Sequence, residues 1–410
     1  MKTIIRVLLS TVVLALSACG GGGGGGGPPT PNPTAYSYVT NQVTSNNIVS
    51  NYAVGDLNGD GLDDVVIGGW SNQDISNSNL AILIQNSDGT LTDKTIELVG
   101  NNQYPGSNNS LIGDFDHDGF NDIWLPGYND CNGCTAQSVM LWGSASGKFT
   151  RQTFDVKVSS HGSCRADMNG DGFEDLLIRG VWDPSVNNYG YYLNNGNRTF
   201  TFVPAHYAHG SQTCSVIKDT NTHHYAIVQG SNVTDAPPGY ISSINILDNN
   251  LNLIKQIGVA SQDTNTNDLV GSITVDVNGD GLLDFVLVFN TLASGAPGRK
   301  EVWLNRGNDN FTYEYTIDNV YNNQYDIQSI EYQGNKLYFF NAPNGDAILY
   351  RLFNGQFEPY KRDSFLSMAT ALGGHVGVKD WSIRFATVYR GSAGLYMFQD
   401  IKQKYYTQKL

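Results

Sequence analysis

Four short segments of this chain carry oxygen-bearing side chains at the same spacing. Each has an aspartate or asparagine at positions 1, 3, 5 and 9, a glycine at position 6 and an apolar residue at position 7. Carboxylate, amide and carbonyl oxygens are the ligands of calcium, and the glycine permits the tight reversal that points them inward. The sequence therefore predicts four calcium ions, with position 7 contributing its backbone carbonyl. The expected ligands are Asp56, Asn58, Asp60, Leu62 and Asp64; Asp114, Asp116, Asp118, Phe120 and Asp122; Asp167, Asn169, Asp171, Phe173 and Asp175; and Asp276, Asn278, Asp280, Leu282 and Asp284.

The segments that follow these loops predict strands rather than helices. An EF-hand needs a bidentate glutamate at position 12 and a flanking helix. Position 12 here is always apolar, as at Ile67 and Leu125, and it lies in a short run typical of a buried strand. We therefore place each loop in the turn of a β-hairpin. An Asp/Asn/Gly turn that holds no metal is the alternative interpretation.

The loops recur at a regular period along the chain. Their first aspartates are residues 56, 114, 167 and 276, so the spacings are 58, 53 and 109. The last spacing is two periods, and a degraded copy begins at Asp219, where we expect His223 and His224 to be surface residues. The pattern of strands continues without ligands at 330–340 and 380–385. Seven structural units result.

Several units contain two further strands after the hairpin. In the first unit these are residues 80–84 and the more polar 90–96, and Asn-Gly or Gly-Asn turns separate the last two strands of other units. Four short strands in each period, with no helix, are typical of propeller blades. We expect an all-β fold: a seven-bladed β-propeller with four-stranded antiparallel blades and calcium loops in four of the inner hairpins.

Together, the loops and their strands resemble FG-GAP/VCBS repeats, which occur in integrin α-subunit propellers and in many bacterial surface proteins. This resemblance implies that each calcium loop joins the two inner strands of a blade, on one face of the disc. Units four, six and seven keep only the strands and are not expected to bind calcium.

The N-terminal residues predict a targeting segment rather than part of the fold. Residues 1–18 form a signal peptide whose apolar core, 7–16, is too short to span a membrane stably. Its end resembles a bacterial lipobox, in which Cys19 becomes lipidated after cleavage. Residues 19–35 follow as a tether rich in glycine and proline, and residues 36–410 form a single propeller domain.

The expected location is the bacterial outer membrane, facing the periplasm or the cell exterior. Residue 20 is glycine rather than aspartate, and resemblance to bacterial lipoproteins makes this a signal for the outer membrane. Membrane contact is expected through the lipid alone. Ordinary secretory cleavage is the alternative.

Charge and cysteine content narrow the possible functions. The formal net charge is −14, and much of the acidity belongs to the four loops, so no basic surface is available to bind nucleic acid. In an oxidising compartment, Cys131 and Cys134 are expected to form a small loop disulfide. A bridge between adjacent units from Cys164 to Cys214 is geometrically reasonable, but the sequence does not fix the connectivity.

The face opposite the calcium loops is the expected site of function. Aromatic and basic residues in its loops favour a glycan or protein partner. A polysaccharide lyase acting on an acidic, uronate-containing polysaccharide is the alternative, by analogy with propeller-fold lyases alone. Its candidate residues are His161, His209, His375, Tyr389, Arg179 and Arg390.

Overall fold

The structure is a computed structural model of the chain. The chain divides into two compact units, Met1–Tyr36 and Ser37–Leu410, and every described residue lies in the second. The described residues are 38–42, 48–70, 78–87, 91–101, 103–104, 107, 109–128, 136–158, 160–180, 190–204, 214–230, 242–259, 267–291, 299–317, 328–332, 335–341, 346–364, 383–388, 394–399 and 404–409.

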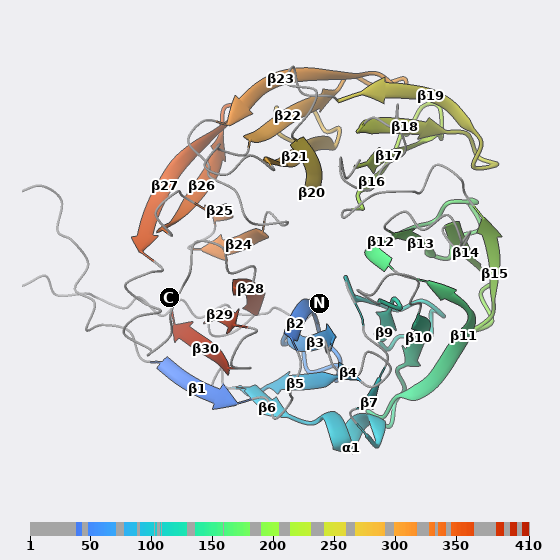
Figure 1. Cartoon of the computed structure of the whole chain (residues 1–410), viewed down its shortest axis with the longest axis vertical. Coiled ribbons are helices and arrows are strands. Elements are labelled where there is room, and N and C mark those ends of the chain that lie inside the picture. Colours follow the sequence, from blue (N-terminus) through green and yellow to red (C-terminus); the bar gives the residue numbers. More distant parts are fainter. Residues whose placement is uncertain are drawn as a thin grey trace, which may run out of the picture. The chain divides into compact units, whose positions relative to one another are not determined.

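These residues form seven four-stranded antiparallel sheets and one two-stranded sheet (Figure 1). The first sheet contains β2 (Ile48–Gly55), β3 (Asp64–Trp70), β5 (Ala81–Gln85) and β6 (Leu91–Asp93). The second contains β8 (Leu111–Gly113), β9 (Asp122–Leu125), β10 (Ala136–Trp142) and β11 (Thr150–Val158). The third contains β12 (Ser160–Ala166), β13 (Asp175–Gly180), β14 (Gly190–Asn194) and β15 (Phe200–Pro204).

The next three sheets repeat this order. The fourth contains β16 (Val216–Lys218), β17 (Tyr225–Gln229), β18 (Ser243–Leu247) and β19 (Leu253–Gly258). The fifth contains β20 (Asn267–Val275), β21 (Asp284–Thr291), β22 (Arg299–Asn305) and β23 (Phe311–Ile317). The sixth contains β24 (Gln328–Tyr332), β25 (Asn335–Asn341), β26 (Asp346–Phe353) and β27 (Gln356–Ser364). β24 and β25 confirm the strand–turn–strand predicted at 330–340.

The seventh sheet combines both ends of the described chain. It contains β28 (Ile383–Val388), β29 (Gly394–Gln399), β30 (Lys404–Lys409) and β1 (Tyr38–Gln42). β1 pairs antiparallel with β30, from Tyr38 opposite Gln408 to Gln42 opposite Lys404. The first described strand of the chain therefore completes a sheet whose other three strands come last, which the repeat pattern alone did not predict.

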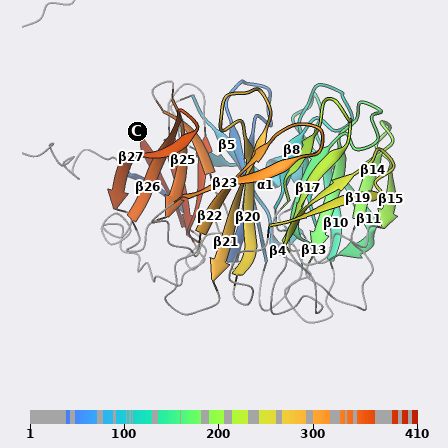
Figure 2. The ribbon, with the colours of Figure 1, turned by 90° about the horizontal axis from the view of Figure 1, so that it is seen from above.

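Apolar side chains fill the spaces between successive sheets. The second strand of a sheet is buried on both faces, so it reads as a continuous apolar run: Val65, Ile123 and Leu176 are all fully buried. Five clusters of described side chains each join two neighbouring sheets, from the first to the sixth. In Figure 2 the strands of neighbouring sheets run side by side, and blue, teal and gold loops lie at one end of them.

The prediction of an all-β propeller with four-stranded antiparallel blades is confirmed. The prediction that there is no helix is wrong at one place. Residues 90–96 were expected to form a strand, but β6 ends at Asp93 and α1 (Thr95–Val99) follows. The Thr95 hydroxyl donates to Asp93 (2.6 Å) and accepts from the Ile82 N–H (2.8 Å), which turns the chain away from the sheet.

The remaining small elements accompany that helix. Gly100, with φ of 80°, ends α1 in the left-handed conformation. The two-stranded sheet pairs β4 (Ser78–Asn79) with β7 (Gln103–Tyr104). Among the described residues, no helix has the length and apolar character needed to cross a membrane.

Candidate functional site

The predicted calcium segments form turns between the first two strands of their sheets. They are named here loop 1 (56–64), loop 2 (114–122), loop 3 (167–175) and loop 5 (276–284), after the sheet to which each belongs. In loop 1, Asp56 accepts the N–H groups of Gly59 (2.7 Å) and Gly61 (2.8 Å). Asn58 accepts the Asp60 N–H at 2.9 Å, and Asp60 accepts the Leu62 N–H at 2.8 Å.

Loops 3 and 5 repeat these four contacts at distances of 2.7–3.1 Å. In loop 2 the Asp118 N–H donates to both Asp114 (3.0 Å) and Asp116 (3.2 Å). The backbone N–H groups therefore turn the side-chain oxygens at positions 1, 3 and 5 inward, whether the residue is aspartate or asparagine.

The aspartate at position 9 joins each loop to the third strand of its sheet. In loop 1, one Asp64 oxygen accepts the Leu57 N–H and the other accepts the Gln85 N–H, both at 2.8 Å. Asp122, Asp175 and Asp284 make the same pair of contacts at 2.7–2.8 Å. All four side chains are fully buried. Each carboxylate is thus a structural part of the blade as well as a predicted ligand.

Burial changes the protonation of these four groups. It raises the pKa of Asp64 and of Asp122 to about 7, and that of Asp175 to about 6. The pKa of Asp284 is raised for the same reason. Backbone N–H donors and neighbouring loop aspartates act in opposite directions on these pKa values, and both effects are smaller than that of burial. A cation near the carboxylate would favour its ionised form.

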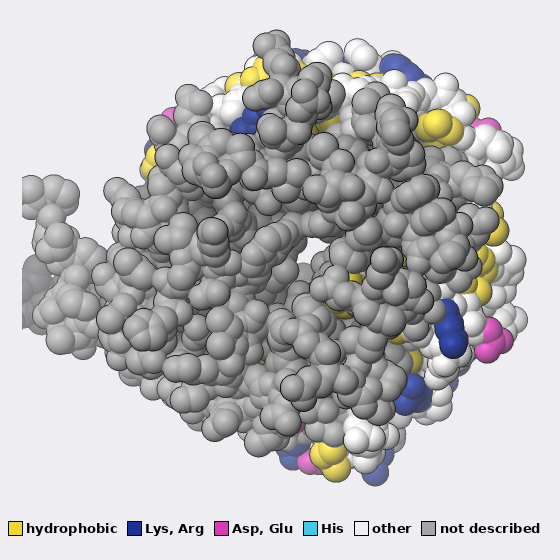
Figure 3. Space-filling model, in the orientation of Figure 1, with side chains coloured by type: hydrophobic (Ala, Val, Ile, Leu, Met, Phe, Trp, Pro, Cys, Tyr) yellow, Lys and Arg dark blue, Asp and Glu magenta, His cyan; other side chains and the backbone are white. Residues whose placement is uncertain are grey.

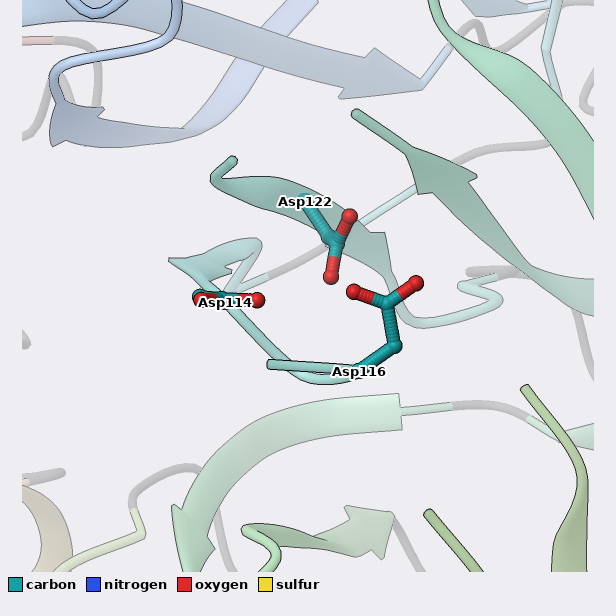
Figure 4. A group of neighbouring side chains, drawn as sticks. All are labelled: Asp114, Asp116 and Asp122. Atoms are coloured by element: carbon teal, nitrogen blue, oxygen red, sulfur yellow. The ribbon is translucent and has the colours of Figure 1, made fainter. Parts of the chain in front are cut away.

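The donor set fits a hard divalent cation. In loop 2, Asp114, Asp116 and Asp122 each offer a carboxylate oxygen within 4.8 Å of the others. Figure 4 shows Asp116 and Asp122 facing one another, with Asp114 on a third side. An all-oxygen set built on a flexible turn suits calcium better than zinc or copper, which prefer nitrogen or sulfur ligands.

The apolar residue at position 7 packs within its own blade. A Cβ atom added to Gly196, in the turn between β14 and β15, would lie 2.4 Å from the Phe173 ring. The equivalent atom on Gly307 would lie 3.8 Å from Leu282. Leucine and phenylalanine side chains contain no oxygen, so position 7 can offer a cation only its backbone carbonyl.

Loop 2 differs from the other three loops at position 3. Asn58, Asn169 and Asn278 each donate an amide N–H to the position-5 carboxylate, at 3.0, 2.9 and 2.8 Å. Loop 2 has an aspartate, Asp116, which is acceptor-only when ionised.

Arg198, in the β14–β15 turn of the next sheet, supplies the donors that loop 2 lacks. Its guanidinium reaches Asp116 (2.5 Å) and Asp118 (3.1 Å) and lies 5.3 Å from the centre of the Trp142 ring. The Asp116 hydrogen bond raises the pKa of Arg198 above its ordinary value. Loop 2 therefore has an internal cation beside two of its predicted ligands.

The degraded copy, loop 4 (219–224), is held by side chains of the next sheet. Asp309, in the β22–β23 turn, accepts the Thr222 hydroxyl at 2.8 Å. Its carboxylate also lies 2.6 Å from Nδ1 of His224. His223 is exposed as expected, but the expectation that His224 is a surface residue is wrong, because it is half-buried in this contact.

Arg198 and Asp309 were both missed from the sequence, because each acts on a loop in a different unit. The available signal was the single change from asparagine to aspartate at position 3 of loop 2. An extra carboxylate in an otherwise repeated motif indicates that a cation lies nearby.

The lyase candidates are mostly outside the described residues. His209, His375, Tyr389 and Arg390 lie there, and for His161 and Arg179 only the backbone is described. β12 carries His161 at a register shift beside the Gly162–Arg179 pair. The acid–base roles of the histidines and of Tyr389, and the pairing of Arg179 or Arg390 with a substrate carboxylate, stay predictions. In the face that Figure 3 shows, the visible Lys, Arg, Asp and Glu side chains lie along the rim.

A disulfide joins the third and fourth sheets. Cys164 and Cys214 are bonded, with their Cα atoms 5.4 Å apart, which confirms the bridge considered from the sequence. Cys131, Cys134 and the predicted lipidation site Cys19 lie outside the described residues.

Sequence comparison supports the repeat assignment over part of the chain. Residues 39–125, which include loops 1 and 2, match the FG-GAP-like repeat family. No curated protein matches the sequence.

Solved structures with similar folds span nearly the whole chain. The crystal structure of BBS1N in complex with ARL6DN, soaked with lead, aligns with a TM-score of 0.53 and 10% identity, covering 91% of this chain and 95% of that one. The mercury-soaked form of the same complex aligns with a TM-score of 0.51 and 9% identity, covering 92% and 96%. At such low identity, the likeness shows the propeller fold alone.

Proposed function

We propose that this protein is a calcium-stabilised, lipid-anchored propeller that binds a protein or glycan partner. The observation that carries the calcium part is the hydrogen-bond frame repeated in loops 1, 3 and 5 and varied in loop 2. In each loop a fully buried aspartate links the turn to the third strand. Such a frame holds several oxygens together before any cation arrives, so little ordering is needed on binding.

Calcium would be held by the residues at positions 1, 3, 5 and 9 and by the carbonyl of position 7 in each loop. When bound, it supplies positive charge that offsets the repulsion among the three or four carboxylates of a turn. The chain's own contribution is to fix those oxygens on two adjacent strands. Binding should therefore stabilise each inner hairpin, with affinities of about 10⁻⁴–10⁻³ M, as in extracellular modules.

The seven four-stranded sheets are proposed to be the seven blades of one closed ring. The pairing of β1 with β30 supports closure, since a strand from each end of the chain completes the same sheet. In this arrangement Cys19 would carry the lipid, and the tether would hold the ring at the outer membrane.

A protein is the favoured partner, with a glycan as the second possibility. BBS1N, a propeller of similar fold, is described in complex with a protein, ARL6DN. The proposed contact surface is formed by the loops opposite the calcium turns. Calcium bound in the turns at one end of the strands would keep those strands in register. The same strands carry the proposed contact loops at their other end.

The calcium proposal is tested by comparing Asp171→Ala with Asp219→Ala. Asp171 belongs to loop 3, whereas Asp219 occupies the first position of loop 4, which has histidine (His223) at position 5 in place of aspartate. Thermal unfolding would be followed in calcium and in EDTA. Asp171→Ala should reduce the calcium-dependent rise in Tm, and Asp219→Ala should leave that rise unchanged. Equal loss of the calcium effect in both variants, or no calcium effect in the parent protein, would contradict the proposal.

A further inference from the structure

The outer turn of one sheet lies against the inner loop of the preceding sheet. Arg198, in the β14–β15 turn, contacts loop 2. Asp309, in the β22–β23 turn, contacts loop 4. A Cβ atom on Gly355, in the β26–β27 turn, would lie 3.8 Å from the Cα of Asn278 in loop 5. Among the described residues, an outer turn therefore contacts the inner loop of the preceding sheet at three places.

Arg198 and Asp309 occupy one equivalent position of their turns. Each follows by four residues the asparagine, Asn194 or Asn305, whose N–H binds the buried aspartate of its own sheet. Both adopt the left-handed conformation, with φ of 64° and 61°. Leu251 is the equivalent residue in the fourth sheet and also has φ of 64°. This costly conformation aims the side chain across the gap between sheets.

The residue type at this position matches the loop that it faces. Loop 2 has four carboxylates and faces an arginine, whereas loop 4 contains His224 and faces an aspartate. At its predicted ligand positions loop 3 has one carboxylate fewer than loop 2, and Leu251 packs in a cluster with its Met168. The side chain at the turn therefore differs with the loop that it faces: Arg198 meets carboxylates, Asp309 meets a hydroxyl and an imidazole, and Leu251 meets an apolar cluster.

We propose that Arg198 is a resident counter-cation of loop 2 that competes with calcium for Asp116 and Asp118. This inference rests on the proposed calcium binding and adds a regulator to one of its four sites. Calcium at loop 2 would thereby be coupled to the contact between the second and third sheets. The other three loops carry asparagine at position 3 and need no such partner.

The competition follows from the atoms that the two cations would share. Asp116 belongs both to the carboxylate group able to hold a metal and to the ion pair with Arg198. A unit positive charge within about 5 Å of a divalent ion disfavours that ion, by roughly tenfold in affinity when solvent screens the pair. The Arg198 side chain is 44% exposed, so it can move into solvent when calcium binds.

The test compares Arg198→Gln with a matched control, Arg306→Gln. Glutamine removes the charge and keeps a polar side chain of similar length. Arg306 lies in the corresponding region of the fifth sheet, but it pairs with Glu314 within its own sheet. A third variant, Asp116→Asn/Arg198→Gln, gives loop 2 the side chains of the other loops.

Calcium binding would be measured by calorimetry and by Trp142 fluorescence, with Trp142→Phe as the background. Arg198→Gln should raise the affinity of one site by about tenfold and lower the Tm in EDTA. The double variant should recover the Tm in EDTA. An asparagine at position 3 can donate to Asp118, as the equivalent asparagines do to the position-5 aspartates of the other three loops. Arg306→Gln should change neither the affinity nor the fluorescence response.

Two failures can be told apart. If calcium binds the parent protein but Arg198→Gln leaves every affinity unchanged or weaker, the competition is overturned and the calcium proposal stands. If calcium binds none of the variants, the calcium proposal itself fails, and the competition fails with it. The pairing would also be contradicted if, in EDTA, the Tm loss of the double variant equalled the sum of the losses of Asp116→Asn and Arg198→Gln measured singly.

Discussion

At the residue scale, the buried aspartate at position 9 belongs both to the hydrogen-bond network of its blade and to the predicted calcium site. One oxygen accepts a backbone N–H of its own loop and the other accepts one at the end of the third strand, as Asp122 does from Phe115 and Gly143. Each oxygen keeps a lone pair that could face a cation. Burial penalises the charge of this carboxylate. Its ionised form is therefore most stable when hydrogen bonds and a cation act on it together.

If calcium binds as proposed, this residue should make its stabilising effect depend on pH. In the unfolded chain the pKa of Asp122 has its ordinary value of 3.8, and in the metal-free fold it is about 7. Between these values the fold holds a proton that the unfolded chain has released, so metal-free stability from this group falls as pH rises. Calcium must displace that proton, so its stabilising effect should grow with pH across this window and level off above it.

The measurement is the difference in Tm between saturating calcium and EDTA, at pH about 5 and about 8. A larger difference at the higher pH is expected. A difference that is the same at both values would show that these carboxyls do not hold the ion.

The sequence predicted side-chain positions correctly where a residue's hydrogen-bond partners lie within the same loop. The spacing of Asp56, Asn58 and Asp60 was enough to predict a turn with inward-facing oxygens, because those contacts are local. Arg198 could not be found this way, since nothing near it in the sequence refers to loop 2. The contact arises only when two sheets pack.

At the element scale, the outer turn and the inner loop of one blade pack as a unit. Gly196 and Gly147 both have φ of 72°, but only a Cβ on Gly196 would collide with a neighbour, the Phe173 ring. The glycines are therefore matched in backbone conformation and differ in packing.

This pair gives a direct test of that packing. Gly147→Ala should cost about 1 kcal/mol, the penalty of a left-handed alanine. Gly196→Ala should cost roughly 1–3 kcal/mol more, because it overpacks the turn against Phe173. Chemical denaturation of both variants would measure the difference. Equal losses would mean that the ring moves aside at no cost.

Element types were predictable wherever period and apolar pattern agreed. β5 lies where residues 80–84 predicted a strand, because side chains such as Ile82 pack between sheets. α1 was mistaken for a strand because it lies at an edge, where few buried contacts select one conformation. There the hydrogen bonds of Thr95, a local and non-periodic signal, decide the structure.

At the scale of the whole molecule, the pairing of β1 with β30 decides whether the ring is closed. Removing residues 36–42 should leave the seventh sheet with three strands and expose the edge of β30. The loss of this strand is expected to cost roughly 2–5 kcal/mol, from several backbone hydrogen bonds and their packing. Exposed edges also promote association between chains.

Thermal unfolding and light scattering of this deletion would measure both effects. Removing residues 20–27 from the tether provides the control, since that segment precedes the propeller domain. Unchanged stability in the first deletion would mean that β1 is not needed to close the ring.

The same pairing fixes the order of events as the chain is made. β1 is synthesised before every other described strand, yet its partner β30 is synthesised after them all. Closing such a long loop is slow, because nearly the whole chain must be in place first. A newly synthesised molecule would therefore spend its last folding step with two open edges. That interval is when it most needs protection from its neighbours.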